Sequence, residues 1–454
     1  MLWVALLFWL LCFDFVSEAK LSPALWVPVI WLFIAGSRNP SQWLSGQMGL
    51  ASAQSLEQGN PLDRGISSAL LLMAIGILMS RSFNWGDFFA RNLALTVFIA
   101  FTLVSVLWSD FPLVALKRWF RDLGNYLMIL VVLSDPRPLE AIRALFRRLF
   151  FLLIPLSILL VKYYPEIGRS YDPWTGIGQY SGAATGKNLL GLQGLLSGLF
   201  FFWDTVANWS HRKKPRTKRL ILVNLGFMVM SLWVLNVANS ATCRVCMGLG
   251  CLVIAAAHTR FFRRRPAFLK VLIPAAFFLY LLLAFGLNLN GQLAGAVGKD
   301  PTLTDRTKIW AFVLSMHTNP LLGTGYESFW MGPRLEWFWE NAGLGHLNEA
   351  HNGYLEVYLN LGLIGLCLVV GFLISSYRKI CRRLRPFSNL ASLTLALWIV
   401  MLFYSVTEAG FRSGLMWLVL LLVGVAVPER PLNRLQRRAA FNDADVTKQL
   451  SVVT

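Results

Sequence analysis

Four polar residues, Glu349, His351, Asn352 and Glu356, stand where an apolar stretch begins in the segment LNEAHNGYLEVYLNLGLIGL (347–366). The chain has only five histidines, so a histidine between carboxylates is a distinctive feature. An imidazole with an ordinary pKa near 6.5 exchanges protons readily at neutral pH, and a neighbouring carboxylate can orient it or raise that pKa. The spacing predicts a site that handles a proton at one end of a helix.

The geometry of this segment leaves several interpretations open. If the helix extends back to residue 349, Glu349 and Glu356 share one of its faces, and His351 and Tyr354 share another. A metal site would add His346 to Glu349 and His351, but that spacing fits no common zinc signature. A histidine that only caps the polar backbone at a helix start is the third interpretation. We predict a site without a metal or a cofactor.

Basic residues in four other segments could bind an anion, since arginine grips phosphate with its planar fork and a helix N-terminus also favours negative charge. Simpler explanations exist: contact with lipid headgroups for Arg244, and a local pair with Asp305 for Arg306. The GK pair at residue 187 lacks the following Ser or Thr of a phosphate-binding P-loop. The segments are NVANSATCR with Arg244, DRTKIW with Arg306, SGAATGKNLLG with Lys187 and Asn188, and LVALKRWFRDL with Lys117 and Arg118.

The composition indicates that these residues are positioned by helices that span a membrane. The chain of 454 residues is 56% hydrophobic and 14% charged, where soluble domains carry about a quarter charged residues. Its apolar runs are long enough to cross a bilayer. We expect an all-α polytopic membrane protein with 12–13 transmembrane helices. The predicted spans are 2–17, 22–36, 65–80, 92–108, 119–134, 149–164, 187–203, 219–238, 243–259, 267–287, 353–375, 389–406 and 413–427.

Basic residues in the short loops predict the orientation. Clusters such as HRKKPRTKR and YRKICRRLR alternate with loops that are richer in acidic residues. The basic clusters and the tail 429–454 should therefore be cytoplasmic, and the segments 37–64, 165–186 and 288–352 should lie outside. The net charge of +19 does not indicate nucleic-acid binding, because it is spread over these clusters. We expect residues 1–454 to form a single membrane domain.

The predicted outer segment 288–352 is much longer than the loops that join most of the other spans. Long ordered loops are usually functional. Thr304 can cap a helix in which Ile309, Trp310, Val313 and Leu314 fall on one face. The aromatic stretch that follows, WMGPRLEWFWENAG, favours the membrane interface. We predict an outer loop with one amphipathic helix. The pair Cys243 and Cys246 in CRVC is explained by packing at a helix interface, although a redox pair is the alternative.

Together these features place several cations and one histidine on the outer face of a helix bundle. That arrangement suits a diphosphate carried on a lipid. We name three candidate catalytic residues, His351, Arg306 and Arg244. The candidate substrate-binding residues are Lys187, Asn188, Lys117, Arg118, Asn352, Tyr354, Glu349 and Glu356.

The segment PTLTDRTKIWAFVLSMHTNPLLGTGYESFW, followed by EAHNGYLEVYLNLGLIGL, resembles the core signature of the bacterial O-antigen ligase and Wzy-type polysaccharide polymerase superfamily. TGKNLLG and NSATCR resemble two further family stretches. GSRNPSQWL and SVLWSDFPLVALKRWFRDL are similar to the ExoQ-like exopolysaccharide polymerase branch. The resemblance covers residues 36–428. The chain departs from the family at Asp305, where a glycine often precedes the loop arginine.

The resemblance implies a metal-independent glycosyltransferase of the integral-membrane GT-C type at the periplasmic face of the inner membrane. It would polymerise undecaprenyl-diphosphate-linked repeat units, with Arg244 and Arg306 on the diphosphate and His351 at the acceptor hydroxyl. The implied partners are the lipid-linked oligosaccharide, the bilayer, and flippase and chain-length regulator proteins. The nearest alternative is a ligase that transfers polymer to lipid A–core. A transporter or flippase of lipid-linked sugars is a third, although its charges should line a path to both faces.

Overall fold

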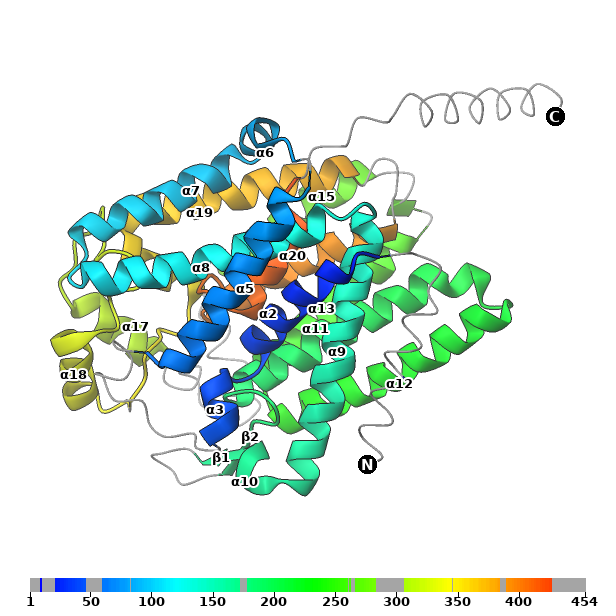
Figure 1. Ribbon diagram of the computed structural model, residues 1–454, viewed down its shortest axis with the longest axis horizontal. Helices are drawn as coiled ribbons and strands as arrows, with labels where there is room; N and C mark the ends of the chain where they lie inside the picture. Colours follow the sequence, from blue (N-terminus) through cyan, green and yellow to red (C-terminus); the bar gives the residue numbers. More distant parts are fainter. Residues whose placement is uncertain are drawn as a thin grey trace.

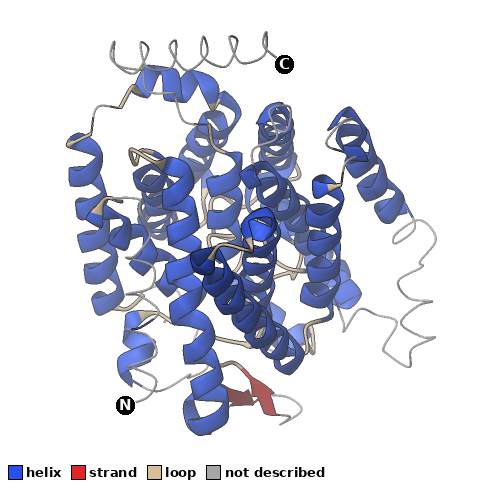
Figure 2. Ribbon diagram, turned by 90° about the vertical axis from the view of Figure 1, so that its right-hand side faces the viewer, coloured by secondary structure: helices blue, strands red, loops and turns tan. Residues whose placement is uncertain are grey.

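The computed structural model describes residues 9, 21–45, 59–81, 83–171, 178–259, 261–262, 266–282, 306–344, 346–383 and 389–426. Helices dominate these residues, and the only sheet among them is the antiparallel pair β1 (Arg169–Tyr171) and β2 (Gly178–Tyr180). Long helices run across the molecule, and the strand pair lies at one end of them (Figures 1 and 2). The prediction of an all-α polytopic membrane protein is confirmed.

A helix stands at each of the twelve predicted spans that follow the first one, which lies almost wholly outside the described residues. These helices are η1 (Pro23–Leu25) with α2 (Trp26–Gly36), α5 (Pro61–Met79), α7 (Leu93–Val104) with η2 (Ser105–Trp108), α8 (Pro112–Leu133), α9 (Pro138–Tyr163), α11 (Lys187–Asn208), α12 (Pro215–Ala238), α13 (Ala241–His258), α15 (Pro266–Leu281), α19 (Gly353–Arg383), α20 (Asn389–Thr407) and α21 (Leu415–Gly424). Short helices α3 (Pro40–Ser45), α6 (Trp85–Arg91), α10 (Pro165–Gly168) and η3 (Trp209–His211) connect them.

Seven of the described helices are long and apolar enough to cross a membrane by themselves. The bent pair of α6 with α7 and η2 adds an eighth candidate, and the segments Pro23–Gly36 and Leu415–Gly424 are shorter apolar helices. The chain is therefore a multi-pass membrane protein. The total of 12–13 spans stays a prediction, as does the division into one membrane domain, an outer loop and a cytoplasmic tail. The tail 429–454 lies outside the described residues.

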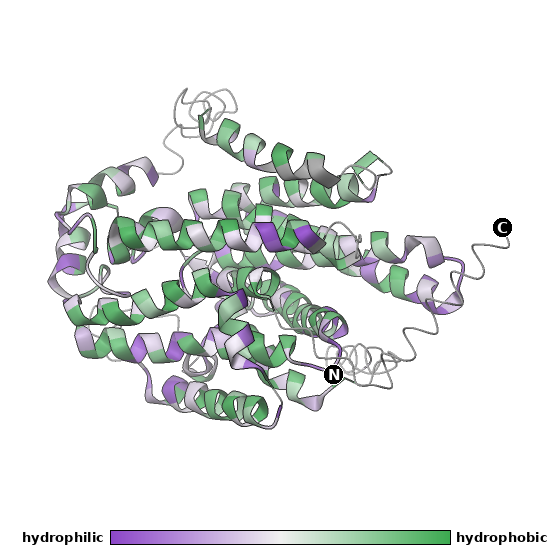
Figure 3. Ribbon diagram, turned by 90° about the horizontal axis from the view of Figure 1, so that it is seen from above, coloured by the Kyte–Doolittle hydropathy of each residue, from purple (hydrophilic) through white to green (hydrophobic). Residues whose placement is uncertain are grey.

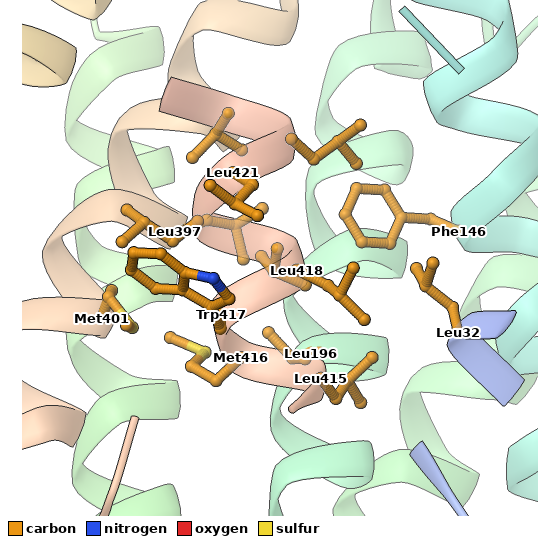
Figure 4. Packing of buried hydrophobic residues seen from close by; sticks show 14 of the residues in the cluster. Leu32, Phe146, Leu196, Leu397, Met401, Leu415, Met416, Trp417, Leu418 and Leu421 are labelled. Carbon is orange, nitrogen blue, oxygen red and sulfur yellow. The ribbon is translucent and has the colours of Figure 1, made fainter. Parts of the chain in front are cut away.

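The core is centred on α21, whose ten residues are all buried. Leu415, Leu418 and Leu421 pack among side chains of α11 and α20, including Leu196 and Leu397 (Figure 4). Apolar residues dominate the long helices (Figure 3), and large apolar side chains such as Leu72, Leu222 and Leu252 are exposed on them, as expected of surfaces that face lipid. A helix that is apolar on all sides belongs at the centre of such a bundle.

Helix α19 is broken at Gly362, whose φ of 63° lies in the left-handed region. The segment 320–325 enters this break and pairs with it through four backbone hydrogen bonds. The N–H groups of Thr324 and Gly325 donate to the carbonyls of residues 359 and 360, at 3.1 and 2.9 Å, and those of residues 363 and 364 donate to Pro320 and Leu321, at 2.9 and 3.2 Å. The loop thus satisfies the backbone groups that a broken membrane helix leaves open.

Two short helices, α17 (Arg306–Ser315) and α18 (Gly332–Asn341), belong to the segment 288–352 that we predicted to lie outside, and they lie together at one end of the long helices (Figure 1). Ile309 and Val313 of α17, which we predicted to share a helix face, are both buried in a small core with Phe338 of α18. The prediction for Leu314 was wrong, since 57% of this side chain is exposed. The proposed cap Thr304 lies outside the described residues.

Candidate functional site

The carboxylate of Glu408 joins four segments that are far apart in the sequence. Glu408 follows the last residue of α20, and its side chain is 4% exposed. One oxygen, Oε1, lies 2.6 Å from Nη2 of Arg306 at the start of α17. The other, Oε2, accepts a hydrogen bond of 3.1 Å from Asn188 in the first turn of α11 and lies 3.5 Å from Nδ1 of His351. We call Asn188, Arg306, Glu349, His351 and Glu408 the Glu408 cluster.

His351 lies in a turn before α19 and has a φ of 49°, an unfavourable backbone region for histidine. Its Nδ1 atom is buried and lies 2.9 Å from Oε1 of Glu349. The side chain as a whole is 17% exposed, so the accessible surface comes from the other ring atoms. Strained backbone is retained where the surroundings hold it, and such sites are often functional.

Electrostatics keep His351 charged. Burial alone would lower the pKa of His351, but the carboxylates of Glu349 and Glu408 outweigh burial and raise the pKa to about 10. Burial would raise the pKa of Glu349, but the charge of His351 and the contact with it lower that pKa to about 2. At neutral pH the cluster therefore holds an imidazolium and a guanidinium against two carboxylates. A histidine in this state donates hydrogen bonds from both ring nitrogens and does not accept a proton.

Three donor groups of the cluster could also hold a metal ion. The nearest ligand atoms of Glu349, His351 and Glu408 lie within 4.8 Å of one another. Carboxylate oxygens with an imidazole nitrogen are a plausible donor set. The guanidinium of Arg306 already contacts Glu408, however, and a cation there competes with a metal for the same oxygens. His346, which the metal interpretation of the sequence would have added, stacks on the ring of Trp339 with 4.5 Å between the ring centroids.

The helix does not extend back to residue 349, the condition for the shared faces, because α19 begins only at Gly353. Glu349 and His351 precede the helix, so neither shares a face with Glu356 or Tyr354. Glu356 is 3% exposed, and its carboxylate accepts hydrogen bonds from the indole Nε1 of Trp330 and from the backbone N–H of Ala350.

The remaining residues near the start of α19 support the turn. Asn352 caps the helix, with Oδ1 accepting from the N–H groups of Tyr354 and Leu355 at 3.0 and 3.1 Å. The hydroxyl of Tyr354 donates to the carbonyl of Leu402 at 3.3 Å, and its ring packs edge-on against Phe411. Through these contacts Asn352 and Tyr354 stabilise the start of α19. Contact with substrate stays a prediction for both residues.

Several predicted basic residues are not joined to the Glu408 cluster by any contact among the described residues. Arg244 is exposed near the start of α13 and donates to Oδ1 of Asn239 at 2.7 Å. Lys187 is exposed at the first position of α11, and Lys117 is exposed on α8. Arg118 donates to the carbonyl of Glu327 at 2.6 Å. Their roles as anion ligands stay predictions.

Further contacts concern alternatives that the sequence left open. Arg306 pairs with Glu408, and the alternative partner Asp305 lies outside the described residues, so a local pair with it stays untested. Arg121 pairs with the adjacent Asp122 at 2.9 Å. Cys243 and Cys246 are buried free thiols among the core residues, which fits packing at a helix interface.

Sequence reasoning missed Glu408 and Arg412. Both stand in TEAGFRSG, the short connection between α20 and α21, where a carboxylate directly follows an apolar helix. An ionisable residue at the mouth of a membrane helix is a functional candidate by default, so the signal was present. Nothing in the sequence showed that this carboxylate reaches an arginine 102 positions earlier.

Comparison with known proteins adds the family. Residues 226–370 match the model of the family described as O-Antigen ligase. The chain is 27% identical over 319 residues to the exopolysaccharide production protein ExoQ of Rhizobium meliloti (strain 1021), which covers 65% of this chain and 67% of that protein. Both matches support a similarity to the O-antigen ligase and Wzy-type polymerase superfamily.

These matches confirm the resemblance that the motifs indicated, including the ExoQ-like branch. They support a membrane glycosyltransferase-like activity of the ligase or polymerase type. The family match includes Arg244, Arg306, Glu349 and His351, and it ends before Glu408.

Proposed function

We propose that the protein extends a glycan carried on undecaprenyl diphosphate by transferring it to a second lipid-linked repeat unit, at the periplasmic face of the inner membrane. The observation that carries this proposal is the pairing of Arg306 with Glu408 beside the charged imidazole of His351. A diphosphate can take the place of the Glu408 carboxylate on Arg306, since both are anionic oxygen groups that match the guanidinium fork.

In the proposed reaction the acceptor hydroxyl oxygen forms a bond to the anomeric carbon of the donor sugar. The bond from that carbon to the diphosphate oxygen breaks, and the electron pair leaves with the diphosphate. Arg306 stabilises the charge that develops on this leaving group. The position of Arg244 on the same family stretch makes it the second candidate for this task. Direct displacement of this kind inverts the anomeric centre.

The raised pKa of His351 changes the role that the sequence suggested for it. With a pKa of about 10, almost all His351 is protonated at neutral pH, so it orients the acceptor or stabilises negative charge as a cation. The proton of the acceptor hydroxyl then goes to the carboxylate of Glu408, which the diphosphate displaces from Arg306. Glu349 is the weaker base, because the charge of His351 lowers its pKa to about 2.

A cell-free reaction tests the proposal. Purified protein with undecaprenyl-diphosphate-linked repeat units, without metal or nucleotide, should give a ladder of longer glycans. Arg306→Ala and His351→Ala should abolish the ladder while the protein still inserts into membranes. No chain growth by the wild type with authentic substrate would refute the proposed polymerase, and full activity of both variants would refute the site.

Ligation of finished polymer to lipid A–core is the second candidate, because the family model is described as O-Antigen ligase. The relative named for exopolysaccharide production favours polymerisation. The two functions differ in what accumulates when the protein is removed from the cell. Single lipid-linked repeats would support the polymerase, and finished lipid-linked polymer would support the ligase.

A further inference from the structure

Arg412 joins two loops that meet above the end of α20. Its Nη1 atom donates a hydrogen bond of 2.6 Å to the carbonyl of Asn348, and its Nε atom lies 3.3 Å from Oε2 of Glu327. The side chains of Arg412 and Glu327 are 26% and 15% exposed, so the pair is largely shielded from water. Asn348 opens the turn that carries His351.

The residues 348–353, which we call the His351 turn, are held at three points. Arg412 binds the carbonyl of Asn348 at one end. Near the middle, the N–H of Ala350 donates to the carboxylate of Glu356. At the other end, the N–H of Gly353 donates to the backbone carbonyl of residue 408 at 3.0 Å. The left-handed backbone of His351 persists because these contacts enclose it on both sides.

Glu327 is itself fixed to the helix bundle. Its φ of 51° is also left-handed, and its carbonyl accepts from Arg118 of α8. The preceding residue, Tyr326, donates its hydroxyl to Oδ2 of Asp122 on the same helix at 2.9 Å. Ser413, which follows Arg412, donates to Oδ1 of Asp122 at 2.8 Å. A continuous polar connection therefore runs from α8 through Glu327 and Arg412 to the His351 turn.

We propose that Arg412 and Glu327 are positioning residues, which fix the His351 turn to α8 and thereby hold the imidazole where the reaction needs it. This inference rests on the proposed function, because it assumes that His351 takes part in the transfer. The donors of Arg412 described above are engaged by a carbonyl and a carboxylate of the protein, and the charge of Glu327 neutralises its own. A catalytic group must be held to within about 0.5 Å, so loss of such a support costs turnover more than affinity.

Kinetics of Arg412→Gln, Glu327→Gln and the double variant test this. We expect the maximal rate of chain growth to fall about 10- to 100-fold in Arg412→Gln, with the donor KM within about threefold of wild type. The double variant should be no slower than Arg412→Gln, because the two side chains act as a unit. Arg412→Lys should recover part of the rate, since it keeps the charge and loses the fork. The matched control is Arg334→Gln, which breaks another arginine–carboxylate pair, the contact of 2.9 Å between Arg334 of α18 and Asp110.

A measurement without substrate complements the kinetics. Amide hydrogen exchange of peptides that cover residues 347–353 should become faster in Arg412→Gln and stay unchanged in Arg334→Gln. Without the contact of Arg412 with Asn348, the turn opens more often and exposes the N–H groups of Ala350 and Gly353. An unchanged maximal rate, unchanged exchange, or a loss that is entirely in donor KM would overturn the positioning role. In the last case Arg412 would bind the donor itself.

The two proposals fail in different ways. If the wild type extends glycans and His351→Ala does not, while Arg412→Gln keeps its maximal rate, only the positioning role fails. If the wild type extends no glycan with authentic substrate, the proposed function fails, and hydrogen exchange still decides whether Arg412 holds the His351 turn.

Discussion

Arg306 and Glu408 lie 102 positions apart in the sequence and 2.6 Å apart in space. The pair joins the start of α17 to the end of α20. His351 lies beside the same carboxylate, so Glu408 contacts both cationic side chains. The pair keeps the guanidinium of Arg306 in place, where the proposed diphosphate can replace the carboxylate of Glu408.

Glu408→Gln should impair the protein in two ways. The neutral amide leaves Arg306 as a largely buried cation without its carboxylate, and breaking such a pair from one side costs about 3–5 kcal/mol in the free energy of unfolding. It also removes one of the carboxylates that keep His351 protonated. We expect a lower melting temperature in detergent and chain growth reduced at least about 100-fold. Arg334→Gln serves as the control, and equal effects of both variants would argue against a special role for Glu408.

The charge of His351 predicts a dependence of stability on pH. A pKa raised from about 6.5 to about 10 means that the folded state favours the imidazolium. The resulting stabilisation is complete below about pH 6.5 and disappears as the pH rises through about 10. The difference in melting temperature between the wild type and His351→Gln should therefore shrink over this interval. A difference that grows with pH would mean that the histidine is buried in its neutral form.

Activity should follow the same protonation state. If the imidazolium orients the acceptor, the maximal rate stays high at pH 7–9 and falls as the pH approaches about 10. In Glu349→Gln this fall should move to lower pH, because the carboxylate whose charge raises the pKa of His351 is gone. Glu336→Gln, at an exposed position of α18, is the control. A rate that increases with pH between 7 and 9 would instead identify His351 as the base.

Chelators test whether the Glu408 cluster works with a metal ion or without one. We expect chain growth to be unchanged after dialysis against EDTA, since Arg306 supplies positive charge at the oxygens where an ion would bind. Loss of activity with EDTA, restored by one divalent metal and absent in Glu349→Gln, would show that Glu349, His351 and Glu408 hold a metal.

The break in α19 can be tested with two glycines of the same helix. A Cβ at Gly362 would clash with the backbone of Leu321, and its φ of 63° is unfavourable for alanine, whereas the space around Gly371 is open. Gly362→Ala should destabilise the protein by several kcal/mol and expose the segment 320–325 to protease, with the magnitude typical of a strained backbone or a displaced segment. Gly371→Ala should be neutral or slightly stabilising. Similar melting temperatures of the two variants would contradict the observed packing.

Apolar periodicity was sufficient to locate the helices, because each membrane helix satisfies its backbone within its own residues. The same reasoning found His351, Glu349, Arg306 and Asn188, since polar groups at helix ends are conspicuous against an apolar background. It did not identify Glu408, because the partners of this carboxylate lie far away in the chain. It placed the start of a span at residue 353, where α19 begins, but it did not predict the turn before the helix. Asn352 caps the helix there, but only the contact of Ala350 with Glu356 explains why the turn before it has its shape.

The interlocked backbones of 320–325 and 359–364 have a consequence for engineering. Outer loops are usually treated as interchangeable attachments, to be replaced when the sugar preference of a membrane enzyme is altered. Here a loop taken from a relative without the matching helix would leave Leu359 and Asn360 with unpaired carbonyls inside the bundle. A functional chimera must therefore exchange the loop and the outer part of α19 as one block.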